Sequence, residues 1–247
     1  MKTGIQVSSV KPLLKTTEQV RIAFSRMAAL DCRYVQLQWI DPAVPISDIA
    51  AALAENGIQS LSVQDFYNIV RNDLEYYVNL NAATGGIWLT VSRIPERCKS
   101  PEGLDLFIGE LRDLQEILKP LGQRVCLHPV TADFTAVTGM NAVEYILDRM
   151  PELEICLDLF HLNRNCADMP GFIRRYAGRI PMVHFKDADP QGKLVPAGSG
   201  TVNYAGVVDA CRDAGVEYGF AEQETWEGDP YECLNQTLSW LNEELEK

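Results

Sequence analysis

The chain has 247 residues, 47% of them hydrophobic, and this length and composition indicate a single domain over residues 1–247 with a large core. Its net charge of -12 argues against a nucleic-acid partner, because phosphate binding depends on lysine and arginine contacts, and a small polar substrate fits better. The chain shows no secretory leader, no run of about 20 apolar residues and no CxxC pair among its seven cysteines, so we expect a cytoplasmic protein that does not enter a membrane.

Eight short apolar runs that are typical of strands alternate with helical patterns. They lie near residues 4–9, 34–39, 59–63, 86–91, 124–128, 154–158, 181–186 and 218–222. Helix starts support this register, because Thr16 and Gln19 can form a capping box and Asp229-Pro230 opens the last helical pattern. Such alternation predicts a parallel sheet with right-handed crossovers. The eight units favour an α/β fold consisting of one closed (β/α)8 TIM barrel.

Three side chains that bind divalent metals well each end a strand-like run. They are Asp158 in ICLDLFHL, His184 in MVHFKD and Glu222 in GFAEQE. The chain has only three histidines, and the other two, His128 and His161, also lie at or just after strand ends. Strand C-termini converge on one face of a barrel, which indicates an enzyme with its site there. The alternatives are buried core imidazoles and, for Asp158, a helix N-cap.

Residues of equal parity in a strand point to the same side, so we expect Glu224 beside Glu222 and Lys186 beside His184. Lys186 could bind a substrate oxygen or stabilise an enolate, or it could pair with a neighbouring aspartate. Glu224 could equally be a solvated loop charge. A mixed carboxylate and imidazole set suits one Mn, Mg, Co or Zn ion, and the sequence does not choose among them.

These motifs resemble the sugar phosphate isomerase/epimerase family of xylose-isomerase-like TIM barrels over nearly the whole chain. LDLFHL looks like the family motif L-D-x-x-H, GRIPMVHFKD like G-R-I-x-x-V-H-x-K-D, GSGTVNY like G-x-G-x-V-D, and GFAEQE like G-W-x-x-x-E-Q-D. The resemblance implies one divalent metal held by Asp158, His184 and Glu222 with a carboxylate from the fifth strand. It also implies that His161 and Lys186 touch the substrate.

The fifth strand departs from the family pattern. Many relatives read H-N-H-x-x-E-F, where this chain reads HPVTADF, so Asp133 replaces the glutamate and Val130 the second histidine. Asp133 is therefore the expected fourth metal ligand. The second strand carries Gln36 where relatives often have glutamate.

The resemblance implies proton transfer next to a carbonyl, with Glu222 as a base on one side and Asp133 or His128 on the other. We expect an isomerase or epimerase acting on a sugar or keto-polyol, with Lys186 assisting and Glu224 contacting the substrate. The alternatives are a dehydratase that uses the same site and a non-catalytic sugar-binding barrel with an altered metal site. A related endonuclease is disfavoured by the few histidines and the acidic charge. The sequence leaves a homo-oligomer open.

Overall fold

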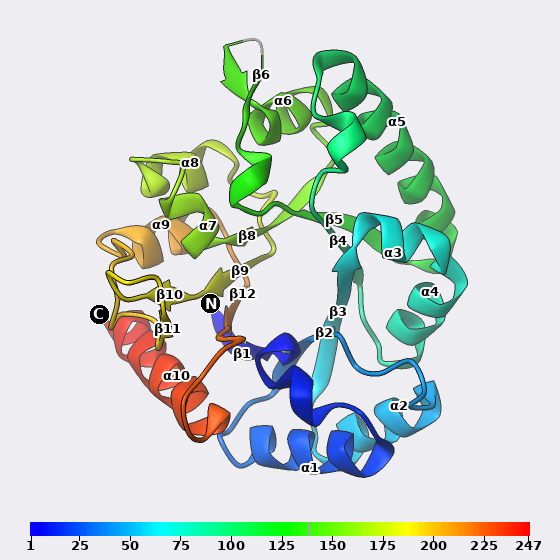
Figure 1. Ribbon diagram of the computed structural model, residues 1–247, viewed down its shortest axis with the longest axis vertical. Coiled ribbons are helices and arrows are strands. Elements are labelled where there is room, and N and C mark those ends of the chain that lie inside the picture. The colour runs from blue at the N-terminus through cyan, green and yellow to red at the C-terminus, as the bar shows by residue number, and fades with distance from the viewer. Residues whose placement is uncertain (138) are drawn as a thin grey trace.

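The computed structural model describes residues 1–137 and 139–247. Eight parallel strands form a closed barrel in the order β1-β12-β9-β8-β5-β4-β3-β2, with helices around it (Figure 1). The strands are β1 (Lys2–Gln6), β2 (Tyr34–Gln38), β3 (Gln59–Phe66), β4 (Trp88–Ser92), β5 (Arg124–His128), β8 (Glu154–Asp158), β9 (Met182–Phe185) and β12 (Tyr218–Ala221). The predicted (β/α)8 TIM barrel is confirmed.

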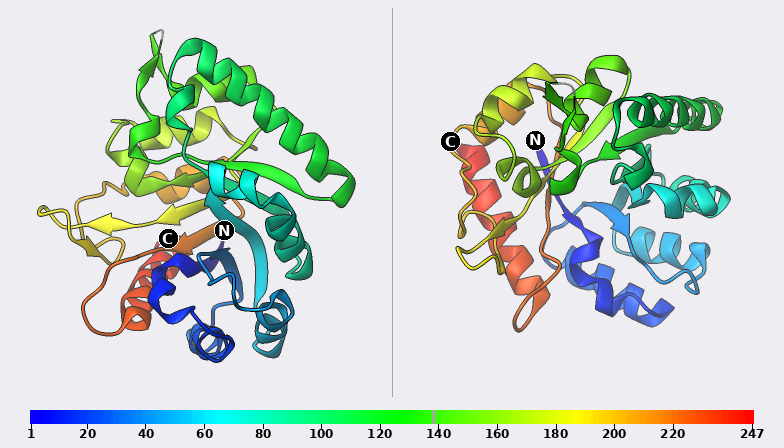
Figure 2. Two further views of the ribbon diagram at one scale, coloured as in Figure 1. Left: turned by 45° about the vertical axis from the view of Figure 1, so that its right-hand side comes forward. Right: turned by 45° about the horizontal axis from the view of Figure 1, so that its top comes forward.

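The helices form the outer layer of the molecule, and two short hairpins extend beyond the barrel (Figure 2). The helices are α1 (Thr17–Ala28), α2 (Ile46–Glu55), α3 (Tyr67–Asn72), α4 (Leu74–Ala83), α5 (Pro101–Leu118), α6 (Ala142–Arg149), α7 (Leu159–Asn163), α8 (Met169–Arg175), α9 (Val207–Asp213) and α10 (Pro230–Glu246). The hairpins pair β6 (Ala136–Val137) with β7 (Met140–Asn141) and β10 (Asp187–Ala188) with β11 (Leu194–Val195). Over the described ranges, no helix combines the length and apolarity that crossing a membrane requires.

Local signals define the predicted helix starts. The Thr16 hydroxyl accepts a hydrogen bond from the Gln19 backbone N–H at 3.2 Å, and α1 begins at Thr17. Asp229 caps α10 in the same way, by accepting from the backbone N–H of Tyr231. Both predicted N-caps are confirmed, and each satisfies a backbone donor that a helix leaves free at its start.

Apolar side chains fill the lower part of the barrel interior. This cluster contains Leu61, Trp88, Cys126, Cys156, Met182, Tyr218 and Phe220. Cys126 and Cys156 are fully buried, as expected for small core residues. Two positions after Cys126 comes His128, and two positions after Cys156 comes Asp158, so each pair points to the same side of its strand. Strands β5 and β8 thus carry an apolar side chain deeper in the barrel and a polar one at the C-terminal end. A second, larger apolar cluster packs between the strands and the helices.

The first predicted strand ends earlier than expected. β1 stops at Gln6, and Val7–Leu13 forms a 3-10 helix. The reason is a long-range contact, because the Ser8 hydroxyl donates to Glu222 and the Ser9 hydroxyl accepts from the backbone N–H of Gln223. These bonds turn the chain across the mouth of the barrel instead of continuing it along the sheet.

Candidate active site

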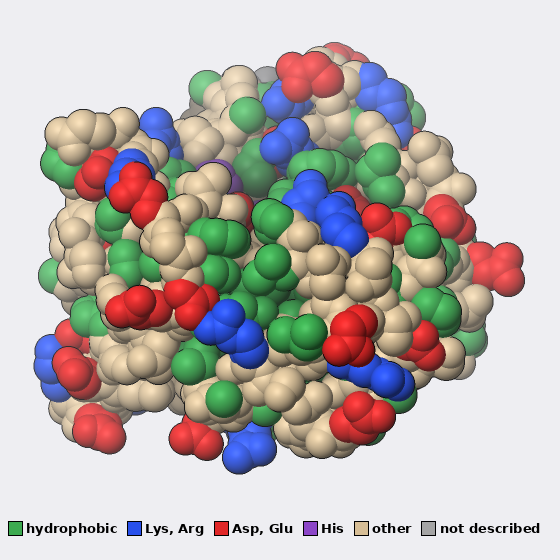
Figure 3. Space-filling model, turned by 60° about the horizontal axis from the view of Figure 1, so that its bottom comes forward, with side chains coloured by type: hydrophobic (Ala, Val, Ile, Leu, Met, Phe, Trp, Pro, Cys, Tyr) green, Lys and Arg blue, Asp and Glu red, His purple; other side chains and the backbone are tan. Residues whose placement is uncertain are grey.

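A cavity of about 750 Å³ opens at the C-terminal ends of the barrel strands. It is lined by most of the residues that the sequence pointed to, namely His128, Asp133, Asp158, His161, Lys186, Glu222 and Glu224. In the space-filling view, histidine is visible only in a recess behind neighbouring side chains (Figure 3). The predicted site residues therefore share one concave region at the face expected of this fold.

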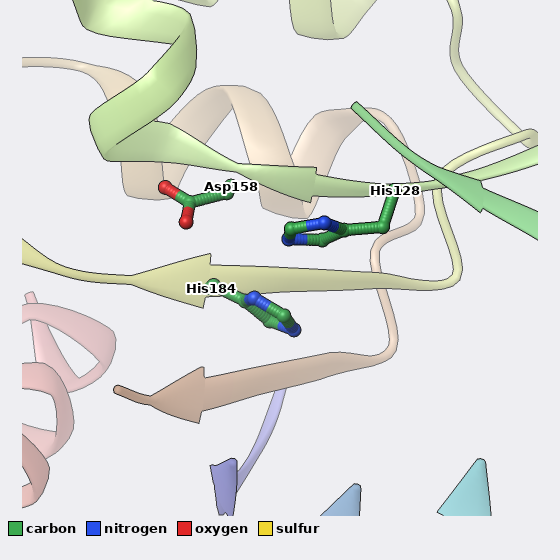
Figure 4. A group of neighbouring side chains, drawn as sticks. All are labelled: His128, Asp158 and His184. Atoms are coloured by element: carbon green, nitrogen blue, oxygen red, sulfur yellow. The ribbon is translucent and has the colours of Figure 1, made fainter. Parts of the chain in front are cut away.

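Two of these side chains, His128 and Asp158, converge with His184 closely enough to share one metal ion. His128, Asp158 and His184 each offer a ligand atom within 4.8 Å of the others, and all three are buried. They come from the neighbouring strands β5, β8 and β9, and they point into a common space (Figure 4). Asp158 and His184 are register partners across β8 and β9. The parallel pairing thus aligns an oxygen and a nitrogen ligand at one level of the barrel.

His128 is the last residue of β5, and only one of its two ring nitrogens has a hydrogen-bond partner among the described residues. Its Nδ1 lies 3.3 Å from the Ser92 hydroxyl, while its Nε2 is buried without a hydrogen-bond partner among the described residues. Burial and the nearby His184 hold the pKa of His128 well below its usual value. The ring is therefore neutral at pH 7, with a nitrogen lone pair available to a cation.

Asp158 has a different role for each carboxylate oxygen. Its Oδ1 accepts from the backbone N–H of His161 at 3.1 Å and caps α7. Its Oδ2 is buried without a hydrogen bond among the described residues and lies 3.6 Å from His161 Nε2. The N-cap and the metal-facing carboxylate, which were alternatives in the sequence, are thus compatible in one side chain.

Glu222 directly follows β12, and its carboxylate contacts His184 of the converging group. Its Oε2 lies 3.0 Å from His184 Nδ1, and its Oε1 accepts from the Ser8 hydroxyl at 3.2 Å. Burial alone would raise the pKa of Glu222, but Lys186, His184 and His128 together hold it well below its usual value. The carboxylate is therefore charged in this buried position.

The donor set suits a divalent cation. Buried polar atoms without hydrogen-bond partners among the described residues, such as His128 Nε2 and Asp158 Oδ2, are costly, and a cation that binds both atoms would remove this cost. Asp133, the expected fourth ligand, lies outside the converging group. Its carboxylate accepts from the backbone N–H of Val130 at 2.9 Å and faces Lys99 Nζ at 3.9 Å. Among the described residues, the converging group thus contains His128, which was expected as a base, whereas Glu222 and Asp133, which were expected as ligands, are not part of it.

Lys186 lies next to the carboxylates and forms an ion pair with Glu224 at 2.6 Å, not with a neighbouring aspartate. Burial lowers the pKa of Lys186, but Glu222, Asp158 and Glu224 outweigh this and raise it. The ammonium group stays charged. Burial and Glu222 raise the pKa of Glu224. Glu224 is therefore a partly buried member of the site and not a solvated charge.

His161 is the third histidine at the mouth, and it lies above the other two on α7. Its Nδ1 lies 2.8 Å from the Thr131 hydroxyl, and burial lowers the pKa of the ring. Its ring centroid is 6.3 Å from that of His128. A neutral imidazole in this position can exchange hydrogen bonds with a bound hydroxyl compound.

The two halves of the barrel interior differ in charge. Strands β5, β8, β9 and the end of β12 carry the ionisable groups described above. Strands β1 to β4 carry buried neutral polar side chains instead, namely Gln6, Gln36, Gln38, Ser60, Ser62, Gln64, Thr90 and Ser92. A ligand in the cavity would thus meet amides and hydroxyls from these strands and ionisable groups from the other strands, while Arg93, Glu96 and Lys99 in the segment after β4 add charges to the cavity wall.

Sequence reasoning missed an aromatic part of the cavity wall. Trp39 and Phe66 line it with ring centroids 5.9 Å apart, and the Arg93 guanidinium stacks on Phe66 at 4.4 Å. Trp39 and Arg93 directly follow β2 and β4 and have positive φ angles of 58° and 66°. Non-glycine residues adopt this conformation at a cost of about 1–3 kcal/mol, and such residues cluster at functional sites. Their positions directly after strand ends were the available signal.

A closed barrel with buried carboxylate and imidazole groups at its C-terminal mouth defines a TIM-barrel protein with a candidate metal site. Residues 15–244 match the model of the xylose isomerase-like TIM barrel family, and the chain belongs to this family of sugar isomerases and epimerases. Comparison with curated protein sequences finds no match.

Solved structures with the same fold include several sugar epimerases. A sugar phosphate isomerase/epimerase from Parabacteroides distasonis is 15% identical, with a TM-score of 0.81 over 97% of this chain and 93% of that one. D-allulose 3-epimerase from Methylomonas sp. in complex with D-allulose is 14% identical, with a TM-score of 0.78 and coverages of 98% and 96%. The 3-keto-D-glucoside 4-epimerase of E. coli is 18% identical, with a TM-score of 0.71 and coverages of 98% and 99%. At these identities the likeness shows the fold.

Proposed function

We propose that the protein is a divalent-metal-dependent isomerase or epimerase that moves a proton next to the carbonyl of a sugar or keto-polyol. The observation that carries the proposal is the converging group of His128, Asp158 and His184 at the mouth of a barrel of this family, in contact with Glu222. Such a set leaves coordination positions for substrate oxygens. A bound Mn, Mg, Co or Zn ion would act as a Lewis acid toward the substrate carbonyl.

The side chains around this group supply the proton chemistry. Glu222, a buried carboxylate, takes the proton from the carbon next to the carbonyl, and the electron pair of the broken C–H bond moves toward the carbonyl oxygen. Lys186 carries a positive charge that stabilises the negative charge developing there. Return of the proton to the opposite face of the same carbon gives an epimer. Return of the proton to the former carbonyl carbon, with the proton of the adjacent hydroxyl passing to the enolate oxygen, gives an isomer.

Glu224 is the favoured partner of Glu222 in this exchange. The two carboxyl groups lie in one cavity, and their surroundings shift their pKa values in opposite directions. Paired groups of this kind commonly divide the acid and base roles. Asp133 and His128 are the other candidates for the second base.

Deuterium exchange tests the proposal without knowledge of the product. A panel of ketoses, keto-sugars and keto-polyols is incubated with the protein and Mn²⁺ in heavy water, and label is measured at the carbon next to the carbonyl. We expect at least one compound to be labelled by the wild type and none by Glu222→Gln, which keeps the shape but removes the base. Glu227→Gln is the matched control, because this exposed residue of the same loop pairs with Lys193 on the surface.

Each other outcome supports a different conclusion. Labelling that survives Glu222→Gln would move the base role to Asp133, His128 or Glu224. Metal binding without labelling of any compound would contradict the proposed reaction and support a non-catalytic sugar-binding barrel. Loss of a hydroxyl from a labelled compound would identify a dehydratase that uses the same site.

A further inference from the structure

A chain of buried amides connects the first strand of the barrel to the imidazole of His184. Gln6 on β1 and Gln36 on β2 are both 0% exposed. The Gln6 side-chain amide donates to Gln36 Oε1 at 2.9 Å, and the same oxygen lies 2.6 Å from His184 Nε2. The order of donors and acceptors along this chain determines which nitrogen of His184 carries the proton.

A backbone group fixes the direction of the chain. The backbone N–H of Ser8 donates to Gln6 Oε1 at 3.3 Å, and a backbone nitrogen can only donate. The Gln6 NH₂ group therefore faces Gln36, which must present its oxygen. The Gln36 NH₂ group donates to the hydroxyls of Ser62 and Thr90 at 3.2 and 3.3 Å. Because Gln36 Oε1 is an acceptor, His184 Nε2 must be the donor.

We propose that Gln36 is a positioning residue that holds His184 with its proton on Nε2 and leaves the Nδ1 lone pair free for a divalent cation beside Glu222. His184 Nδ1 lies 3.0 Å from Glu222 Oε2. Two acceptors at this separation repel each other unless a proton or a cation lies between them, and a bound divalent cation would take the place of that proton. This inference rests on the metal site of the proposed function, but not on its reaction.

The neutral amide has a consequence for the charge of the site. An imidazole that binds a metal commonly donates its other N–H to a carboxylate, a carbonyl or water, which fixes the ring. Gln36 does this without adding another buried carboxylate beside Asp158 and Glu222. Cys156 Sγ also lies 3.2 Å from His184 Nε2. Burial raises the pKa of this thiol well above its usual value, so Cys156 stays neutral and adds no negative charge beside His184.

Long-range ¹H–¹⁵N spectra of the imidazole rings test the proposal, because the chain has only three histidines to assign. In the metal-free and the Zn²⁺-loaded wild type we expect a proton on His184 Nε2. Gln36→Met removes the acceptor and should mix the tautomers of the metal-free protein. It should also weaken Zn²⁺ binding about 10–100-fold, as loss of such a partner typically does. Gln36→Glu retains an acceptor and should keep the proton on Nε2.

Gln123→Met is the matched control. Gln123 is a buried amide that accepts from Asn81 and donates to the carbonyl of Val78, away from the cavity. This variant should be less stable but should bind Zn²⁺ like the wild type. If Gln36→Met does not fold, Gln6→Met provides the second test, because it leaves Gln36 in place but removes the group that orients it. We expect mixed tautomers there too.

Two results would overturn the proposal. One is a wild-type His184 whose Nε2 carries no proton. The other is a folded Gln36→Met variant with the wild-type tautomer and wild-type Zn²⁺ affinity. Neither measurement involves turnover, so a lack of deuterium exchange would count against the proposed reaction alone.

Discussion

Asp158 shows how one side chain can support both the fold and the site. One oxygen caps α7 through the backbone N–H of His161, and the other is buried without a hydrogen bond among the described residues. The cap needs only an acceptor, whereas a divalent cation favours the full charge of a carboxylate. The two roles can therefore be separated by changing the charge and keeping the shape.

We predict that Asp158→Asn loses bound metal but keeps its fold. Asparagine caps helices about as well as aspartate, so the free energy of unfolding of the metal-free protein should change little, whereas Asp158→Ala should cost about 1 kcal/mol. Metal analysis and chemical denaturation measure the two effects. Asp168→Asn is the control, because Asp168 caps α8 through Gly171 at an exposed position outside the cavity. Wild-type metal content in Asp158→Asn would refute the ligand assignment.

Local sequence predicts some site residues and not others. Asp158, His184 and Glu222 could be placed at one mouth because each ends an apolar run of strand length. The contact between Gln36 and His184 joins residues 148 positions apart across the barrel interior, and no local pattern reports it. The position of His128 beside Asp158 and His184 likewise depends on how β5 and β8 lie next to each other.

At the scale of elements, one carboxylate organises the segment between β9 and α9. Asp187 is fully buried, and its oxygens accept from the backbone N–H groups of Ala188, Gly198, Gly200 and Val202. These donors are consequently directed inward and not toward a ligand. The hydroxyl of Tyr204, near the end of this segment, donates to the carbonyl of Lys186 at 2.9 Å. The segment thus supports the backbone of a cavity residue.

We predict that Asp187→Asn loosens this segment and leaves the barrel intact. The new NH₂ group would face backbone donors, and each buried donor left unsatisfied costs about 1–3 kcal/mol. Cleavage by a protease within residues 189–201 should become faster, which mass spectrometry of the fragments measures. Asp189→Asn is the control, because Asp189 is only partly buried and accepts from the backbone N–H groups of Gln191 and Lys193 in a turn that asparagine also forms. Equal cleavage rates in the two variants would contradict the prediction.

Most barrel strands could be predicted from sequence, and two of them, at residues 124–128 and 154–158, have the predicted bounds. Continuous apolar runs are typical of parallel strands that are buried on both faces. The run at residues 4–9 was predicted only in part, because bonds from Ser8 and Ser9 to the far end of the chain replace the last part of that strand. The strand propensity of a short segment does not report contacts with residues that lie far away in the sequence.

At the scale of the whole molecule, metal binding should stabilise the fold. A ligand at 100 times its dissociation constant adds about 2.7 kcal/mol, and this corresponds to a rise in Tm of about 5–10 °C for a domain of this size. Thermal melts with EDTA and with excess Mn²⁺ measure the difference. Asp158→Asn should show no such rise, and an equal rise in this variant would indicate that Mn²⁺ binds elsewhere.

The barrel closes between β1 and β12, its first and last strands. Ser8 and Glu222, which are 214 positions apart, bond to each other beside this closure. A growing chain on the ribosome exposes His128 and Asp158 long before Glu222 has been synthesised. The contact of Glu222 with His184 therefore forms only when translation is nearly finished, so this end of the cavity is assembled by the finished domain.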